Sequence, residues 1–199
     1  DALVSNLHEK LDDLPPGAVV GTSSLRRVVL LRALRPDLKI DPLRGNLDTR
    51  LRKLDDGHYA AIILAAAGLK RLGLASRIRQ VFEPEQMLPA AGQGALGIEV
   101  RTERADLLQV LEPLGHHATW LAVAAERAVS RSMGGSCSMP LAAHAIYSGE
   151  YLQLRAAWGD PEGSATLVRA QSAAAVADLD RAAELGAEVA ERLKTAGAH

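Results

Sequence analysis

The sequence is poor in the residues that hold small or extracellular proteins together. It has one cysteine in 199 residues, so no disulfide can form within the chain, and a lone thiol suits a reducing compartment such as the cytoplasm. Aromatic residues make up only 3%, so any core must consist of Leu, Val, Ile and Ala. The net charge of −1 gives no overall field that would attract nucleic acid or a membrane. No apolar run has the length of a membrane span, and no signal peptide is visible. We therefore expect a cytoplasmic protein that binds neither.

The first ninety residues alternate between short apolar runs and helical patterns. Strands are expected to end near Val20, to lie near Ile40 and to lie in the apolar run that begins at Tyr59 and precedes Gly68. Each is followed by a turn and a helical pattern: from about Leu25 to before Pro36, up to Gly57, and from Gly68 onward. This alternation is typical of strands packed against crossover helices. We predict an α/β fold with a parallel-type βαβ sheet, like a lobe of a periplasmic binding protein, over residues 1–90.

Each turn from strand to helix combines small or hydroxyl residues with basic side chains. The turns contain Thr22, Ser23, Ser24, Arg26 and Arg27, then Arg44, Gly45, Asn46 and Arg50, then Ala67, Gly68, Lys70 and Arg71. In a parallel sheet these turns meet at one edge, where helix N-termini add free N–H groups. Guanidinium groups bind carboxylates and phosphates through paired hydrogen bonds, so the pattern predicts an anion-binding pocket. The alternative is that a chain with 18 Arg and 5 Lys simply places arginines on its surface and uses the serines as helix caps.

The remaining residues form two further parts. The motif AGQGALGIEVR predicts a turn leading into a strand over residues 95–100, followed by a helix; we assign residues 91–113 to a segment returning from another domain. Gln93 and Gly94 could contact a ligand, or the glycines could only form a hinge. Residues 114–199 predict a small α+β domain with a three-stranded antiparallel sheet. It has an amphipathic helix ending at Gly134 and Gly135, three strands and a closing helix over residues 176–193.

The single thiol, Cys137, lies in the loop RSMGGSCSMP between the amphipathic helix and the first strand of this domain. A glycine- and serine-rich loop predicts an accessible side chain, whereas a buried structural cysteine is the ordinary alternative. A nucleophilic cysteine would need a histidine partner, but His116, His117 and His144 show no signature spacing. The sequence also lacks the ligands for a zinc site, and no metal is expected.

Four stretches of the sequence resemble the porphobilinogen deaminase (hydroxymethylbilane synthase) family. They are GTSSLRR, LRGNLDTRLRKLDDGHYAAIILAAAGLKRLG, LPAAGQGALGIEVR and ERA…GGSCSMPLAAHA. By this resemblance, residues 1–90 correspond to domain 2 of the family, residues 91–113 to the returning segment of domain 1, and residues 114–199 to domain 3. The resemblance implies a monomeric transferase of tetrapyrrole and haem biosynthesis. Such an enzyme joins four porphobilinogen molecules head to tail into hydroxymethylbilane and releases ammonia at each step.

The resemblance also implies a cofactor and a set of contacts. A dipyrromethane is expected to be joined by a thioether to Cys137, in a loop that must let the growing oligopyrrole move. The implied cofactor contacts are Thr22, Ser24, Arg26, Arg27, Gln93 and Gly94. The implied contacts to substrate or growing chain are Arg44, Arg50, Ala67 and Gly68, with Arg71 and Arg77 nearby.

The family's catalytic aspartate belongs to an N-terminal region that has no counterpart in these 199 residues. No catalytic residue is therefore assigned, and the aspartates at positions 41, 48, 55 and 56 are interpreted as turn or helix residues. We expect the chain to be a fragment without polymerising activity, in which the strand over residues 95–100 lacks its sheet partners. Two alternatives are a reversible small-anion-binding lobe of a solute-binding or effector protein and, with little support, a cysteine hydrolase.

Overall fold

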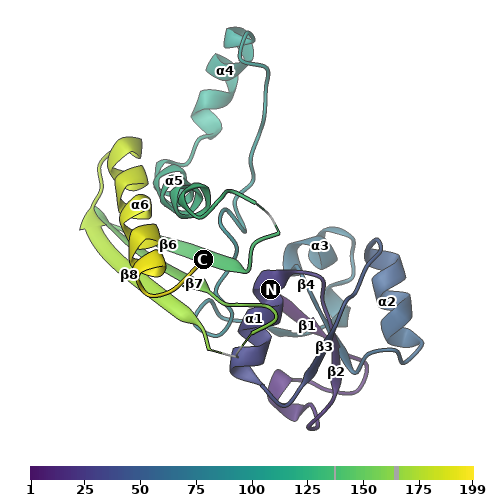
Figure 1. The fold of residues 1–199 in the computed structure, drawn as a ribbon. Helices are drawn as coiled ribbons and strands as arrows, with labels where there is room; N and C mark the ends of the chain where they lie inside the picture. The colour runs from purple at the N-terminus through teal and green to yellow at the C-terminus, as the bar shows by residue number, and fades with distance from the viewer. Residues whose placement is uncertain (137, 164–165) are drawn as a thin grey trace.

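The computed structural model describes residues 1–136, 138–163 and 166–199, and it places two sheets in two domains (Figure 1). The N-terminal domain has a five-stranded sheet in the order β3-β2-β4-β1-β5. The strands are β1 (Ala2–Val4), β2 (Val19–Gly21), β3 (Lys39–Asp41), β4 (Ala61–Leu64) and β5 (Ile78–Val81). The helices of this domain are α1 (Leu25–Leu34), α2 (Leu47–Asp55) and α3 (Ala66–Arg71), with short 3-10 turns at Leu11–Asp13 and Ala75–Arg77.

The predicted α/β fold is confirmed, but the sheet is mixed. β2 is parallel to β3 and β4, as the sequence pattern predicted. β1 lies antiparallel between β4 and β5, and neither β1 nor β5 was predicted. These two strands complete the sheet on the side of β4 that faces away from β2.

Helices cover both faces of this sheet, and β4 is therefore buried on both sides. Successive strand residues point to opposite faces, so Ile63 packs with Leu30 of α1 while Ile62 packs with Leu54 of α2. The all-apolar sequence of β4 is what a central strand with two covered faces requires.

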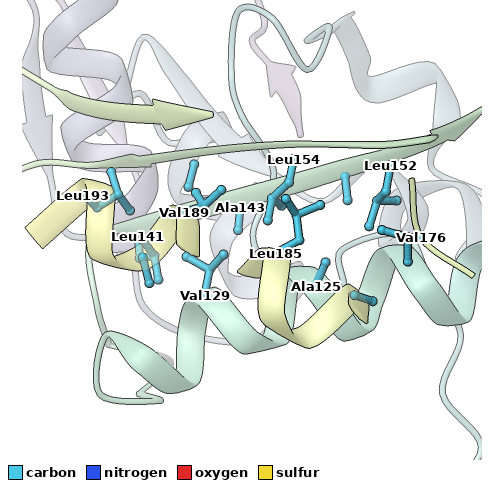
Figure 2. Packing of buried hydrophobic residues seen from close by; sticks show 14 of the residues in the cluster. Ala125, Val129, Leu141, Ala143, Leu152, Leu154, Val176, Leu185, Val189 and Leu193 are labelled. Atoms are coloured by element: carbon cyan, nitrogen blue, oxygen red, sulfur yellow. The ribbon is translucent and has the colours of Figure 1, made fainter. Parts of the chain in front are cut away.

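The C-terminal domain follows the predicted plan. Its elements are α5 (His117–Ser132), β6 (Leu141–Ser148), β7 (Tyr151–Trp158), β8 (Val168–Ala175) and α6 (Leu179–Thr195). The three strands are antiparallel in sequence order, and both helices lie on one face of the sheet. Figure 2 shows Leu152 and Leu154 pointing from the sheet toward Leu185 of α6. The closing helix begins at Leu179 because the Asp178 side chain caps it by accepting from the Arg181 N–H at 2.8 Å.

The segment between the two domains differs from its prediction. Residues 95–100 do not form a strand, and Leu96 is 89% exposed. No strand in the described part of the chain lies beside them, and a strand needs a partner for its backbone groups. The helix expected after them is present as α4 (Ala105–Leu111), which buries none of its residues and stands apart from both sheets (Figure 1). A 3-10 turn, Glu112–Leu114, then leads to α5.

The two domains pack against each other through α1. Ala142 of β6 and Ala157 of β7 join the N-terminal core cluster that contains Leu30. Gly159 comes so close to α1 that an added Cβ would lie 2.9 Å from the Cβ of Val29. The Arg32 guanidinium also donates to the Pro161 carbonyl. None of the helices in the described residues combines the length and hydropathy of a membrane span.

A close helix contact inside the C-terminal domain gives a test of the fold. An added Cβ at Gly186 of α6 would lie 2.3 Å from the Ala125 carbonyl oxygen of α5. We expect Gly186→Ala to lower the free energy of unfolding by about 1–3 kcal/mol, because the helices must separate. Urea unfolding of the full-length protein measures this change. The control is Gly68→Ala, also helical but with open space around the added carbon, which should raise stability by up to about 1 kcal/mol. A gain of stability in both variants would contradict the packing.

Candidate functional site

The three basic turns lie at one edge of the N-terminal sheet. Because β2 is parallel to β3 and β4, the chain leaves all three strands at the same edge, and α1, α2 and α3 begin there. The Ser24 hydroxyl caps α1 by accepting from the Arg27 N–H at 3.5 Å, and the Asn46 side chain caps α2 by accepting from Thr49 at 2.9 Å. The Ser24 side chain therefore caps a helix at the edge where the basic turns meet.

Arg26 and Arg27 form a buried pair that shares one carboxylate. Arg26 Nη2 lies 2.6 Å from Asp1 Oδ2, and Arg27 Nη2 lies 2.7 Å from Asp1 Oδ1. The side chains are 5% exposed for Arg26, 13% for Arg27 and 0% for Asp1. No motif in the sequence predicted that Asp1 belongs to this cluster.

Burial lowers the pKa of both guanidinium groups. The pKa of Arg26 falls to about 9, chiefly by desolvation and then by repulsion from Arg27. Desolvation lowers the pKa of Arg27 to about 10. Both values stay above neutral pH, so the two groups carry two positive charges against the one charge of Asp1. The cluster keeps a net charge of about +1, which favours a further anion.

Gln93 contacts this arginine pair and Asp1. Its Oε1 accepts from Arg26 Nη2 at 3.2 Å, and its Nε2 donates to Asp1 Oδ1 at 3.2 Å. The Leu88 carbonyl accepts from Arg26 Nη1 at 2.7 Å. Gly94 follows with φ +91° and is exposed. Leu88 and Gln93 thus both contact Arg26, although each lies more than sixty positions away from it along the chain.

The hydroxyl groups of the first turn make hydrogen bonds to the backbone of the first and second turns. Thr22 is 3% exposed, and its Oγ1 accepts from the Ser24 N–H at 3.3 Å. The Ser23 hydroxyl donates to the Leu43 carbonyl at 2.8 Å, which ties the first turn to the second. These contacts fix the backbone from which Arg26 and Arg27 extend.

Arg44 and Arg50 lie in the second turn with their charges available. Arg50 Nε donates to the Gly45 carbonyl at 2.8 Å, and Gly45 takes φ +119°, a conformation that favours glycine. Within the described residues neither arginine has a carboxylate at ion-pair distance. Arg44 is exposed and Arg50 is half-buried. Both can therefore meet an anionic ligand.

The third turn contributes backbone rather than side chains. Ala67 and Gly68 lie in the first turn of α3, and both are exposed. The N-cap residue, Ala65, makes no side-chain cap, and an added Cβ at Gly68 would have open space around it. Arg71 is exposed at the end of α3.

Cys137 lies outside the described residues. Its flanks are the end of α5 at Ser132 and the start of β6 at Leu141. Gly134 and Gly135 between them take φ +113° and +69°. The loop therefore begins with two residues in conformations that other side chains rarely adopt.

Arg77 does not belong with the basic turns. Its guanidinium pairs with Asp55 at 2.5 Å and also donates to Asn6 at 3.3 Å, so it links the 3-10 turn before β5 to the end of α2. The hydrogen bond from Arg77 lowers the pKa of Asp55 below its ordinary value of 3.8. We interpret this pair as a surface link between elements.

The Arg77–Asp55 pair predicts a small, pH-dependent stability effect. Arg77→Ala should lower the free energy of unfolding by about 0.2–1 kcal/mol at neutral pH, the usual value of a surface pair. Because the folded pKa of Asp55 is depressed, this difference should shrink as pH falls below 3.8. Urea unfolding at several pH values measures it, with the exposed Arg71→Ala as control. A difference that grows in acid would contradict the assignment.

Two family models match the chain. "Porphobilinogen deaminase, dipyromethane cofactor binding domain" matches residues 1–109, and "Porphobilinogen deaminase, C-terminal domain" matches residues 120–195.

The curated relatives include porphobilinogen deaminases of three bacteria. That of Albidiferax ferrireducens is 69% identical over 196 residues, which is 98% of this chain and 62% of the relative. That of Paraburkholderia phytofirmans is 59% identical over 198 residues, covering 100% and 58%. That of Burkholderia thailandensis is 60% identical over 199 residues, covering 100% and 60%. The chain thus spans about 60% of the length of these relatives. With a cofactor-binding-domain model that matches more than half of its residues, this chain belongs to the porphobilinogen deaminase family.

Proposed function

We propose that the full-length protein with this sequence is a porphobilinogen deaminase. It joins four porphobilinogen molecules head to tail into hydroxymethylbilane and releases one ammonia at each addition. A dipyrromethane cofactor, when bound, supplies the primer that receives the first pyrrole. The observation that carries this proposal is the buried pair Arg26 and Arg27, which shares a single carboxylate at the sheet edge where the turn with Arg44 and Arg50 also lies.

The charge of this sheet edge fits a ligand with several carboxylates. Each pyrrole of such a ligand carries an acetate and a propionate group, so every addition brings two more negative charges. Arg26 and Arg27 have one carboxylate between them, and Arg27 is the more accessible of the two. We assign these arginines to the cofactor and Arg44 and Arg50 to the substrate or growing chain. Gln93 and Gly94 complete the cofactor side, Thr22 and Ser24 hold its first turn, and Ala67 and Gly68 offer backbone contacts to the chain.

A thioether at Cys137 would give this arrangement its processivity. Its flanking glycines suit a loop that changes conformation as the chain grows. A covalent tether keeps every intermediate at the site, so each condensation is effectively intramolecular. The reacting groups would stay in place while the acidic side arms move across the arginines.

The domain division and setting are further parts of the proposal. Residues 1–90 would be the family's domain 2, residues 91–113 the returning segment of domain 1, and residues 114–199 domain 3. The exposure of Leu96, together with a helix α4 that buries none of its residues, supports a further contact surface for the middle segment. The lone cysteine supports a cytoplasmic setting, and the net charge of −1 supports a protein that binds neither nucleic acid nor membrane. Membership of the family supports a monomer.

Arg44 gives the sharpest functional test among the basic turns. Arg44→Leu in the full-length enzyme should weaken binding of substrate or growing chain by about ten- to a hundredfold, since an arginine–carboxylate hydrogen bond is worth roughly 1.5–3 kcal/mol. The measurements are turnover of porphobilinogen and the masses of the enzyme-bound intermediates. Arg52→Leu, an exposed arginine of α2 outside the proposed pocket, is the matched control. Normal turnover by Arg44→Leu would show that the pocket is misassigned.

The tether and the catalytic region give a second test. Intact mass of the full-length enzyme should show an adduct of two pyrrole units, and Cys137→Ser should remove it. The 199 residues alone should form no hydroxymethylbilane, because they contain no counterpart of the family's catalytic aspartate motif. Robust bilane formation by that chain would refute this expectation. A full-length enzyme that binds small anions reversibly and carries no adduct would indicate the binding-lobe alternative.

A further inference from the structure

The segment formed by residues 88–93, here called the connecting segment, is hydrogen-bonded to both domains. On the N-terminal side, the Leu88 carbonyl accepts from Arg26 Nη1 at 2.7 Å and Gln93 Oε1 accepts from Arg26 Nη2 at 3.2 Å. On the C-terminal side, the Pro89 carbonyl accepts from the Ala143 N–H of β6 at 3.0 Å. The same six residues therefore touch the arginine pair and the C-terminal sheet.

Glu126 of α5 makes the strongest of the C-terminal contacts. This residue is 5% exposed, and its carboxylate accepts from the Gly92 N–H at 2.6 Å and from the Ala145 N–H at 2.7 Å. His144 Nδ1 lies 3.6 Å from the same carboxylate. Hydrogen bonds to an ionised acceptor are shorter and about twice as strong as neutral ones. A buried carboxylate with two such donors fixes both of them.

The position of Glu126 follows from the free edge of β6. Among the described strands, β6 pairs only with β7, so the N–H groups along its other edge need acceptors. Pro89 accepts from Ala143, and Glu126 accepts from Ala145, two residues along. The connecting segment and the Glu126 carboxylate thus cover this edge together.

A tight turn connects the position of Gly92 to that of Gln93. The Gln93 N–H donates to the Ala90 carbonyl at 2.9 Å, and the Ala90 N–H donates to Gln93 Oε1 at 3.1 Å. Gly92, inside this turn, has φ +75°, which other residues rarely adopt. Holding the Gly92 N–H therefore sets the direction of the next side chain, which meets Arg26 and Asp1.

We propose that Glu126 is a positioning residue for the Arg26–Arg27 site. It fixes the connecting segment so that the Leu88 carbonyl and the Gln93 amide hold Arg26 in the orientation that receives a carboxylate. The domain that anchors the cofactor loop would thereby also set the geometry of the arginines in the other domain. The identity of the ligand rests on the proposed function. The hydrogen-bond route, from Glu126 through Gly92 and Gln93 to Arg26, does not.

The structural part is tested by hydrogen exchange on the full-length enzyme. Glu126→Gln keeps the size of the side chain but replaces one acceptor oxygen with a donor, so one of the two backbone N–H groups loses its partner. We expect at least one of the Gly92 and Ala145 amides to exchange at least about tenfold faster, which corresponds to the loss of one charged hydrogen bond. Glu184→Gln, an exposed glutamate of α6, is the matched control. Unchanged exchange at both amides would overturn the proposal.

The functional part is tested by a double-mutant cycle on cofactor loading. Loading of the apo-enzyme, followed by intact mass, should slow by about tenfold in Glu126→Gln. Gln93→Ala should slow it as well, and the double variant should be no slower than the more affected single variant, because both act on Arg26. Independent, multiplying effects would contradict a route through Gln93. Should Glu126→Gln not fold, Glu126→Asp keeps the charge with a shorter reach and should show a smaller effect in the same direction.

The outcomes separate this inference from the proposed function. Faster exchange with normal loading in Glu126→Gln, together with a defective Arg44→Leu, would refute the positioning role alone. The proposed function would be refuted if the full-length enzyme carried no adduct and its Arg44→Leu variant showed normal turnover of porphobilinogen. The exchange result would then still report on the hydrogen-bond route.

Discussion

Two adjacent buried arginines that share one carboxylate are the constraint on which this structure depends. Taking a charge out of water is costly, and neighbouring like charges repel each other. Arg26 and Arg27 offset this cost with the carboxylate of Asp1 and with the carbonyls of Leu88 and Ile63. Removing one partner from such a buried group typically costs about 3–5 kcal/mol. The sheet edge therefore carries a preorganised cationic pair whose charge one carboxylate balances only in part.

The surrounding fold gathers these partners from distant parts of the chain. Asp1 precedes β1, the arginines begin α1, and Leu88 and Gln93 follow the last strand of the domain. The C-terminal domain holds the same region from two sides, through Glu126 and the connecting segment and through Gly159 against α1. A domain that carries the tether and also holds the arginines in place would fix the positions of the two ends of a bound cofactor relative to each other.

The sequence predicted those parts of the fold that rest on local patterns. The four-residue apolar run of β4 and the helix α2 between Asn46 and Gly57 have clear local signals, as does the amphipathic helix α5. β1 has three residues and β5 has the mixed sequence Ile-Arg-Gln-Val, so neither shows a pattern that distinguishes it from a loop. The strand expected at residues 95–100 has a strand-like sequence, but the described chain supplies no partner for its backbone.

Some residues of the site could likewise be predicted from local sequence patterns, and others could not. The arginines and glycines of the turns follow directly after predicted strands, so they could be grouped from the sequence. Asp1 and Glu126 could not, because their roles arise from contacts over 25 and 34 residues of separation. A glutamate within a helical pattern is ordinarily expected on the solvated face, whereas Glu126 is buried by the edge of β6.

The most direct measurement is a crystal structure of the full-length enzyme with its cofactor attached. We expect continuous density from Cys137 Sγ to a dipyrromethane, with a carboxylate of that group about 3 Å from the guanidinium of Arg27 or Arg26. Asp1 should remain bound to the pair. A thiol turned away from the N-terminal domain, with both arginines contacting only Asp1, would contradict it.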